Sequence, residues 1–284
     1  MLLKALYGPG ADVRRAAVQN PNATETVLLK ALYNPDASVR PAAARNPNAT
    51  NPVLLKALGD PNSEVRYAAA ENSNATESVL LKALDDNNAW QIRYAAAENS
   101  NATDPVLLKA LDDKDLAVRC AAARNPNATE SILLKALDYP DSNVRLAAAR
   151  NPNANQEVID KALNSYDSEV KVIAIAKASD LGITLDFDSL LQDKDLSVRI
   201  AAREAQKKLQ EPVISPTASI TGDEIAASAV SSNKVLELIW DLIRLRREVN
   251  EESGSSVRSY LKIRRKVKYI TRTVKELESA RHEA

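Results

Sequence analysis

Residues able to act as nucleophiles, acid–base groups or metal ligands are scarce in this chain of 284 residues. Its one histidine, His282, lies two residues from the end, and its one cysteine, Cys120, has no histidine partner. These counts exclude an internal disulfide, a Cys/His zinc site and an iron–sulfur cluster held by this chain alone. The six glycines form no phosphate-binding motif. The sequence therefore predicts no catalytic residue, no metal and no cofactor, and the chain is not expected to be an enzyme.

A row of loop aspartates could still bind an ion. Asp85, Asp86, Asp112 and Asp113 recur at corresponding places in the chain and could hold a divalent cation. Acidic residues that form turns and keep a protein soluble are far more common, and we favour that interpretation.

A basic segment near the end of the chain is the other charged group. Residues 258–275 carry eight Lys or Arg side chains and no Asp or Glu, so they could hold the phosphates of a nucleic acid or another anionic surface. Acidic residues upstream, such as Glu237 and Asp241, could instead pair with this segment within the chain or across a dimer. The candidate anion-binding residues are Arg258, Lys262, Arg264, Arg265, Lys266, Lys268 and Arg272.

The composition is that of a folded protein without a dominant charge. Because 38 basic residues balance 38 acidic ones, net charge does not favour nucleic acid or a membrane surface as a partner. Hydrophobic residues make up 45% but aromatic ones only 4%, which favours many small aliphatic contacts over one large core. The start, MLLKALYGPG, is interrupted too early to be a signal peptide, and no apolar run approaches bilayer length. We therefore expect a soluble, cytoplasmic protein without a membrane span.

An internal repeat of 26 residues organises the chain up to about residue 209, including Cys120 and the loop aspartates. The arginine of a Val-Arg pair, with Ile once in place of Val, recurs at intervals of 26 or 27 residues. It stands at Arg14, Arg40, Arg66, Arg93, Arg119 and Arg145. The lysine of Leu-Leu-Lys-Ala-Leu has the same period, at Lys4, Lys30, Lys56, Lys82, Lys109 and Lys135. Weaker copies extend the array to about residue 209.

One repeat, residues 46–72, predicts a pair of short helices. Thr50 or Asn51 can cap the first helix, and a Gly-Asp-Pro-Asn segment ends it. An alanine-rich second helix follows over Ser63–Glu71. Asn72 is expected to stop it in a left-handed turn, which asparagine tolerates best among residues other than glycine. Helices this short are marginal alone, so stacking of successive repeats must stabilise them.

The repeat resembles a known family. Its pattern, [DN]-P-x-x-x-V-R-x-x-A-A-x-N-P-x-x-T-x-x-x-L-x-x-x-L, read from Asn34 to Leu58, resembles the bacterial leucine-rich repeat variant family, with HEAT-like arrays as its nearest relatives in style. The resemblance covers residues 1–177 and, in a divergent form, 178–209. It implies a helical superhelix. The repeat here is slightly longer than usual, and the cysteine cluster of some relatives is absent, so no cluster chemistry is carried over. We predict an all-α fold, an α-solenoid of short helix pairs.

Two recurrent polar features favour a structural role. Aspartates stand four residues before several repeat arginines, as Asp36 does before Arg40, and this spacing places the two side chains on one helical face. We therefore favour a ladder of ion pairs and hydrogen bonds between repeats over a basic binding stripe. Asn-Ala-Thr, as at Asn48, matches a glycosylation sequon, but a turn and a helix cap explain it without a secretory context.

Recognition is expected at exposed positions that vary between repeats. The residue after each repeat arginine and the residue four positions later lie one turn apart, so they predict a strip along the second helices. Its centre is aromatic and acidic and its flanks are basic, which suits a peptide or a basic patch, and neutral surface variation is the alternative. Trp90, in the only repeat with an inserted residue, is expected on a loop, as a contact residue or as cover for that loop. The predicted partner-binding residues are Arg15, Arg45, Tyr67, Glu71, Trp90, Tyr94, Glu98, Arg124 and Arg150.

The composition changes after the array. We predict a repeat array over residues 1–209, a linker over 210–232 and a C-terminal helical hairpin over 233–284. Apolar residues at three-four spacing in both arms of the hairpin predict a coiled-coil seam, and the remaining apolar surface favours homo-oligomerisation or docking. At the other end the chain begins inside a repeat, so its first three leucines are expected to leave an apolar end exposed.

These features favour a scaffold. We expect a non-catalytic protein that binds another protein through the strip, with the hairpin used for self-association or docking. The alternative is nucleic-acid or anionic-surface binding through 258–275. A HEAT-like repair enzyme would need a basic groove with a catalytic carboxylate, whereas the strip is mixed in sign.

Overall fold

The computed structural model describes residues 1–210, and every regular element among them is an α-helix. The chain divides into two compact units, of which the first is Met1–Ile183 and the second begins at Thr184. The first helices of successive repeats are α1 (Leu2–Ala5), α3 (Glu25–Ala31), α5 (Asn51–Ala57), α7 (Glu77–Ala83), α9 (Asp104–Leu111), α11 (Glu130–Leu137) and α13 (Gln156–Leu163). The second helices are α2 (Ala11–Gln19), α4 (Val39–Arg45), α6 (Ser63–Glu71), α8 (Trp90–Glu98), α10 (Leu116–Arg124), α12 (Ser142–Arg150) and α14 (Ser168–Leu181). The described part of the second compact unit contains α15 (Phe187–Leu190) and α16 (Leu196–Gln210).

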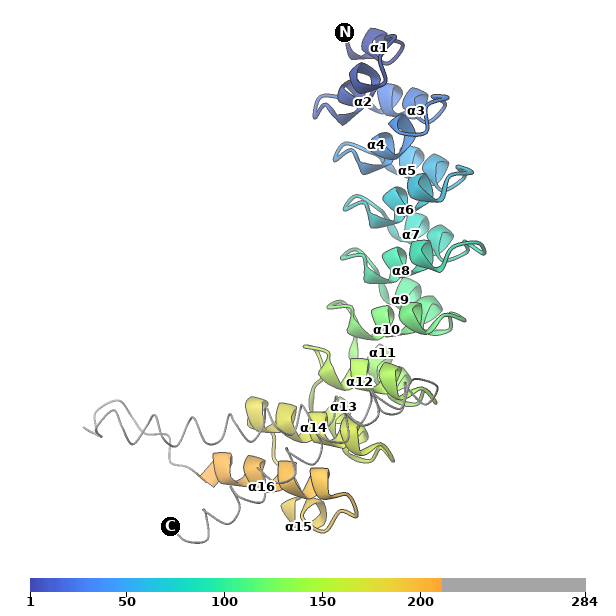
Figure 1. Ribbon diagram of the computed structural model, residues 1–284. Coiled ribbons are helices and arrows are strands. Elements are labelled where there is room, and N and C mark those ends of the chain that lie inside the picture. Colours follow the sequence, from blue (N-terminus) through green and yellow to red (C-terminus); the bar gives the residue numbers. More distant parts are fainter. Residues whose placement is uncertain (211–284) are drawn as a thin grey trace, which may run out of the picture. The chain divides into compact units, whose positions relative to one another are not determined.

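Helices of the same kind stack on one another along the first compact unit (Figure 1). Each second helix from α2 to α12 contacts the second helix of the following repeat, and the first helices from α3 to α13 are stacked in the same way. Helices this short are marginal in isolation, so their contacts with the partner helix and with the matching helix of the next repeat are what stabilises them. The described residues thus confirm an all-α, solenoid-like array of short helices.

The core consists of small and aliphatic side chains at fixed positions of the repeat. Val65, which precedes a repeat arginine, and Leu54, in the first helix of the same repeat, are completely buried. Ala69 is also inaccessible, and the absence of a larger side chain there lets neighbouring second helices approach closely. Burial of one such leucine contributes about 1.5–3 kcal/mol, so each repeat depends strongly on its neighbours.

The N-terminal end is more enclosed than its sequence suggests. Leu6 is only 1% exposed, and Leu2 and Leu3 are half-buried. The expectation of an exposed leucine is therefore wrong for Leu6, whereas Leu2 and Leu3 keep part of their surface accessible. Other apolar residues at this end are exposed, namely Met1, Tyr7 and Val13.

The asparagine at the end of each second helix acts through its side chain. Asn72 follows α6 in an extended conformation, with φ −62° and ψ 133°. No residue other than glycine has a positive φ within the described range. The position of the helix end is thus confirmed, but the left-handed turn expected there is wrong.

Hydrogen bonds between repeats explain this asparagine. The Asn72 carboxamide donates to the backbone oxygens of Ala44, at 2.6 Å, and Asn46, at 3.2 Å, both in the preceding repeat. Its side-chain oxygen accepts a hydrogen bond from the backbone N–H of Asn74 at 2.8 Å. The Asn72 side chain thus provides hydrogen-bond partners for two backbone carbonyls and one backbone N–H. Buried backbone groups without a partner would destabilise the fold, so this asparagine stabilises the contact between repeats. The equivalent residues Asn46, Asn99, Asn125 and Asn151 form the same bonds to their preceding repeats.

Lys177 takes the asparagine position in the following repeat. Its ammonium donates to the backbone oxygen of Asn151, where an asparagine carboxamide would otherwise bind. The second helix of that repeat, α14, continues to Leu181 and ends with Gly182 in a left-handed conformation, at φ 67°. Burial lowers the pKa of Lys177. At this repeat an ammonium group therefore replaces the asparagine carboxamide as the donor to the preceding repeat.

The Asn-Ala-Thr segments also join neighbouring repeats. Asn74 donates to the backbone oxygens of Pro47, at 2.5 Å, and Ala49, at 3.3 Å. Thr50 occupies the N-cap position of α5 without a side-chain bond to that helix, and its hydroxyl donates to the Glu25 carboxylate at 2.6 Å. These contacts support the structural interpretation of the segments.

The arginines form a ladder between repeats, but with different partners from those expected. Arg40 binds Asp60 of the next repeat through two nitrogens, at 2.8 and 3.3 Å. Asp36, four residues before it, instead accepts from Arg14 of the preceding repeat at 2.9 Å. Hydrogen bonds from Ser38 and then from Arg14 lower the pKa of Asp36 to about 2. The expected pairing within one helix is therefore wrong, because a guanidinium at this position reaches across to the neighbouring repeat.

Residues 211–284 lie outside the described residues. The predicted hairpin 233–284 falls there entirely, as does the predicted linker 210–232 apart from Gln210, the last residue of α16. Both remain predictions, as do the domain boundaries that depend on them.

Candidate interaction surface

The predicted strip, defined by the nine residues named for partner binding, lies on the second helices α2, α4, α6, α8, α10 and α12. The position after the repeat arginine is buried at Pro41, Cys120 and Leu146. It is half-buried at Tyr67 and Tyr94. The position four residues later is exposed in all six repeats, at Gln19, Arg45, Glu71, Glu98, Arg124 and Arg150. The exposed strip is therefore charged throughout most of its length and aromatic only at α6 and α8.

Trp90 belongs to this aromatic centre. It is the first residue of α8, not a loop residue, so the expectation of a loop position is wrong. The inserted residue lies in the turn before α8, so Trp90 stands at the first helical position, where α6 has Ser63 and α10 has Leu116. Trp90 is 43% exposed. Its ring meets that of Tyr94 edge to face, with 6.1 Å between centroids. Because the two residues are four apart, they form one row on the helix with Glu98.

Carboxylates surround the two tyrosines. The Tyr94 hydroxyl donates to Glu98 at 3.0 Å. Burial, this hydrogen bond and the negative charge of Glu98 raise the pKa of Tyr94. Burial raises the pKa of Tyr67 too, and the charges of Glu71 and Glu98 add to the effect. Since Glu98 of α8 acts on Tyr67 of α6, the strip is electrostatically continuous from one repeat to the next.

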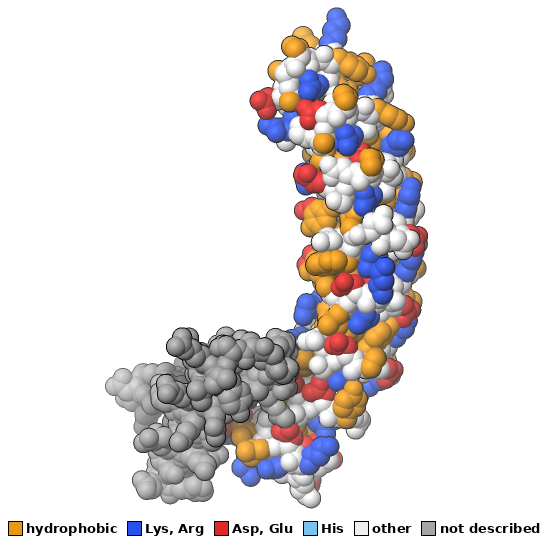
Figure 2. Space-filling model, turned by 45° about the vertical axis from the view of Figure 1, so that its right-hand side comes forward, with side chains coloured by type: hydrophobic (Ala, Val, Ile, Leu, Met, Phe, Trp, Pro, Cys, Tyr) orange, Lys and Arg blue, Asp and Glu red, His pale blue; other side chains and the backbone are white. Residues whose placement is uncertain are grey.

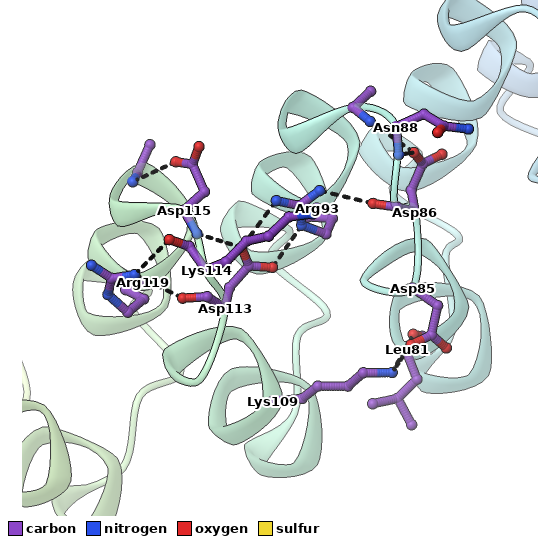
Figure 3. A network of polar contacts seen from close by, with 12 residues as sticks. Leu81, Asp85, Asp86, Asn88, Arg93, Lys109, Asp113, Lys114, Asp115 and Arg119 are labelled. Carbon is purple, nitrogen blue, oxygen red and sulfur yellow. Dashed lines mark hydrogen bonds and ion pairs between the residues drawn. The ribbon is translucent and has the colours of Figure 1, made fainter.

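The repeat arginines and the aspartates of the neighbouring repeats form structural ion pairs. Arg93 binds Asp113 of the next repeat at 2.7 and 3.1 Å and also donates to the backbone oxygen of Asp86 at 2.8 Å (Figure 3). On the first helices, Lys109 donates to Asp85 at 2.6 Å. The side chains of Arg93 and Asp113 are 5% and 8% exposed. These buried contacts use the repeat arginines for packing, which leaves the strip as the variable surface.

The loop aspartates are part of the same ladders. Hydrogen bonds from Tyr139 and then from Lys135 lower the pKa of Asp112. Burial alone would raise the pKa of Asp86, but the hydrogen bonds from Arg66 and two backbone N–H groups lower it. In the described residues, no three His, Cys, Asp or Glu side chains come together as a metal-binding group. The carboxylates predicted to form turns are thus bound mainly to cations of neighbouring repeats.

Acidic and basic side chains are interspersed on the visible face of the array (Figure 2), without a large region of one sign. None of the described helices is long and apolar enough to cross a membrane. The candidate anion-binding residues, Arg258 to Arg272, lie outside the described residues and stay a prediction.

The geometry of the array matches a known structure. A solved chain described as a leucine-rich repeat variant with a novel repetitive protein structural motif has a TM-score of 0.52 to this one. The described fold is similar to that of a leucine-rich repeat variant. Sequence identity is 21%, and the match covers 72% of this chain and 80% of the other. Residues 51–73 match the model of the HEAT repeat. A comparison with curated proteins finds no match.

Some residues that shape the surface were missed by the sequence reasoning. Leu116, the first residue of α10, is half-exposed at the position that Trp90 occupies in α8. The second position of each second helix also matters, because Glu64 pairs with Arg45 at 3.2 Å and Glu169 with Arg150 at 3.5 Å. Both columns follow the 26-residue period and could have been found by aligning the repeats beyond the Val-Arg pair.

Proposed function

We propose that this protein is a non-catalytic scaffold that binds another protein through the strip on its second helices. The observation that carries the proposal is the aromatic centre, in which Trp90, Tyr94 and Tyr67 remain accessible although most of the repeated valine, alanine and asparagine positions are buried. Partly exposed aromatic side chains beside charged ones are typical of the residues that contribute most to protein interfaces. The similarity to a helical repeat fold supports a scaffold, because such arrays offer an extended surface instead of a closed active site.

A comparison of variants tests this function. Affinity capture with the whole chain from lysate of its native host is compared with capture by a Tyr67→Ala, Trp90→Ala and Tyr94→Ala triple variant. Tyr33→Ala is the matched control, because Tyr33 is 71% exposed but lies on the first-helix side of the array. We expect the partner to be lost from the triple variant and retained by the control, with unchanged helical circular dichroism in both. Retention by the triple variant would refute the proposed surface.

Nucleic-acid or anionic-surface binding through residues 258–275 is the second candidate. Eight basic residues without an acidic one support it. Capture repeated with nuclease treatment and with a Lys266→Glu, Lys268→Glu double variant separates the two functions. A partner that survives both treatments favours the strip, whereas loss in both would favour the basic segment.

A further inference from the structure

The exposed charges at the C-terminal ends of the second helices have ion-pair partners at the flanks of the strip but not in its centre. At the flanks, each charge has a counter-charge nineteen residues later, at the second position of the next second helix. Arg45 of α4 binds Glu64 of α6 at 3.2 Å, and Arg150 of α12 binds Glu169 of α14 at 3.5 Å. These pairs neutralise the flanks of the strip within the chain.

In the centre, the counter-charges are missing. Glu71, Glu98 and Arg124 are exposed at the same position of α6, α8 and α10. The second positions of the following helices hold Gln91, Ala117 and Asn143, none of which is charged. Within residues 1–210 none of the three central charges forms an ion pair. The centre of the strip therefore presents charges in the fixed order negative, negative, positive.

The spacing of these three charges suits an extended chain. Second helices of successive repeats are in contact, and contacting helices lie about 8–10 Å apart. An extended peptide advances about 3.3 Å per residue, so every third residue of a peptide that crosses the helices meets the next repeat. The Tyr94 hydroxyl donates to Glu98 at 3.0 Å, and the charges of Glu71 and Glu98 both act on Tyr67, so these two rings lie near the two carboxylates. Trp90 extends the aromatic row through its edge-to-face contact with Tyr94. Aromatic rings next to carboxylates can also attract a guanidinium or ammonium group.

We propose that the strip binds an extended segment of its partner that carries two basic residues and one acidic residue at every third position. The basic side chains pair with Glu71 and Glu98 beside the aromatic rings, and the acidic one pairs with Arg124. The peptide backbone can run in either N-to-C direction, provided that its two basic residues face Glu71 and Glu98 and its acidic residue faces Arg124. This inference rests on the proposed function and names the chemistry of the partner that the strip selects.

Two labelled peptides of identical composition test the charge order. Both are eleven-residue Gly/Ser peptides with two Arg and one Glu at positions 3, 6 and 9; the matched peptide has the order Arg, Arg, Glu and the control has Arg, Glu, Arg. Binding to the whole chain is measured by fluorescence anisotropy at low salt, where surface charges are least screened. The matched peptide is expected to bind about tenfold tighter, because the control brings two pairs of like charges together.

A charge-order variant provides the decisive comparison. Glu98→Arg together with Arg124→Glu keeps the net charge and changes the order on the strip to negative, positive, negative. Both positions are exposed, so the fold should be unaffected, and circular dichroism checks this. The preference should then switch to the control peptide. Equal binding of both peptides, no binding of either at about 1 mM, or a preference that stays the same in the variant would overturn the inference.

The failure of this inference and that of the proposed function are distinguishable. If the peptides show no charge-order preference but the captured partner is still lost from the aromatic triple variant, the strip is the interface and only the inferred partner chemistry fails. If the partner is retained by the triple variant, the interface itself lies elsewhere.

Discussion

Replacing Asn72 by alanine should destabilise the array strongly without changing its surface. Asn72 is 7% exposed, and its side chain forms three hydrogen bonds, at 2.6, 3.2 and 2.8 Å, two of them to carbonyls of the preceding repeat. A typical hydrogen bond contributes about 1 kcal/mol net, so their loss should lower the free energy of unfolding by about 3 kcal/mol. Asn72→Asp should be worse, because a buried carboxylate would face two carbonyl oxygens.

Urea denaturation followed by helical circular dichroism measures this change. Asn87→Ala is the matched control, because Asn87 is an exposed loop asparagine and should alter the free energy of unfolding by less than about 0.5 kcal/mol. An Asn72→Ala variant as stable as the control would refute the hydrogen-bond ladder as a source of cohesion between repeats.

Three further changes probe the packing of the array. Arg93→Ala should lower the free energy of unfolding by about 3–5 kcal/mol in urea denaturation, because it leaves the Asp113 carboxylate buried without its cation; a change below about 1 kcal/mol would contradict this. Burial and a hydrogen bond to Asp112 raise the pKa of Tyr139 to about 12, so its contribution to stability is complete below pH 10 and is lost as the pH rises through 12. A spectrophotometric titration compared with that of a Tyr139→Phe variant should therefore show one tyrosine ionising near pH 12, and its ionisation near pH 10 would refute the contact. Cys120 is 5% exposed and burial raises its pKa, so a thiol reagent should react slowly with the folded chain and rapidly in urea, whereas equal rates would show an open helix α10.

The repeat and its helices could be predicted because they depend on local patterns. The 26-residue period, the caps and the alanine-rich second helices are all properties of neighbouring residues, and the structure confirms the helix pair of residues 46–72 as α5 and α6. The end of the second helix at Asn72 was predicted for the same reason. Its conformation was not, because the hydrogen bonds that hold it come from a repeat 26 residues away.

The polar ladders show where a periodic sequence becomes ambiguous. Asp36 lies four residues before Arg40 and 22 residues after Arg14, and only the geometry of stacked helices decides that it binds Arg14. In any exact repeat, a contact within one repeat and a contact with the next repeat give the same pattern. Helical spacing therefore identified the interacting columns but not the partners.

The sequence indicated which helices carry the strip, but not which of its residues are exposed. The column that contains Tyr67 and Tyr94 varies between repeats, yet it is buried at Cys120 and Leu146. A position that varies between repeats is not necessarily exposed, because it can lie on the side of the second helix that faces the core. The counter-charges of the flanks, Glu64 and Glu169, were missed because they lie on the next repeat.

Hydrogen–deuterium exchange of the whole chain, with and without its captured partner, is the most direct test of the proposed scaffold function. The strip interface predicts slower exchange on binding in α6, α8 and α10, with the first helices α5, α7 and α9 unchanged. Protection of the first helices alone, or of residues 258–275 without any change in the second helices, would contradict the proposed interface.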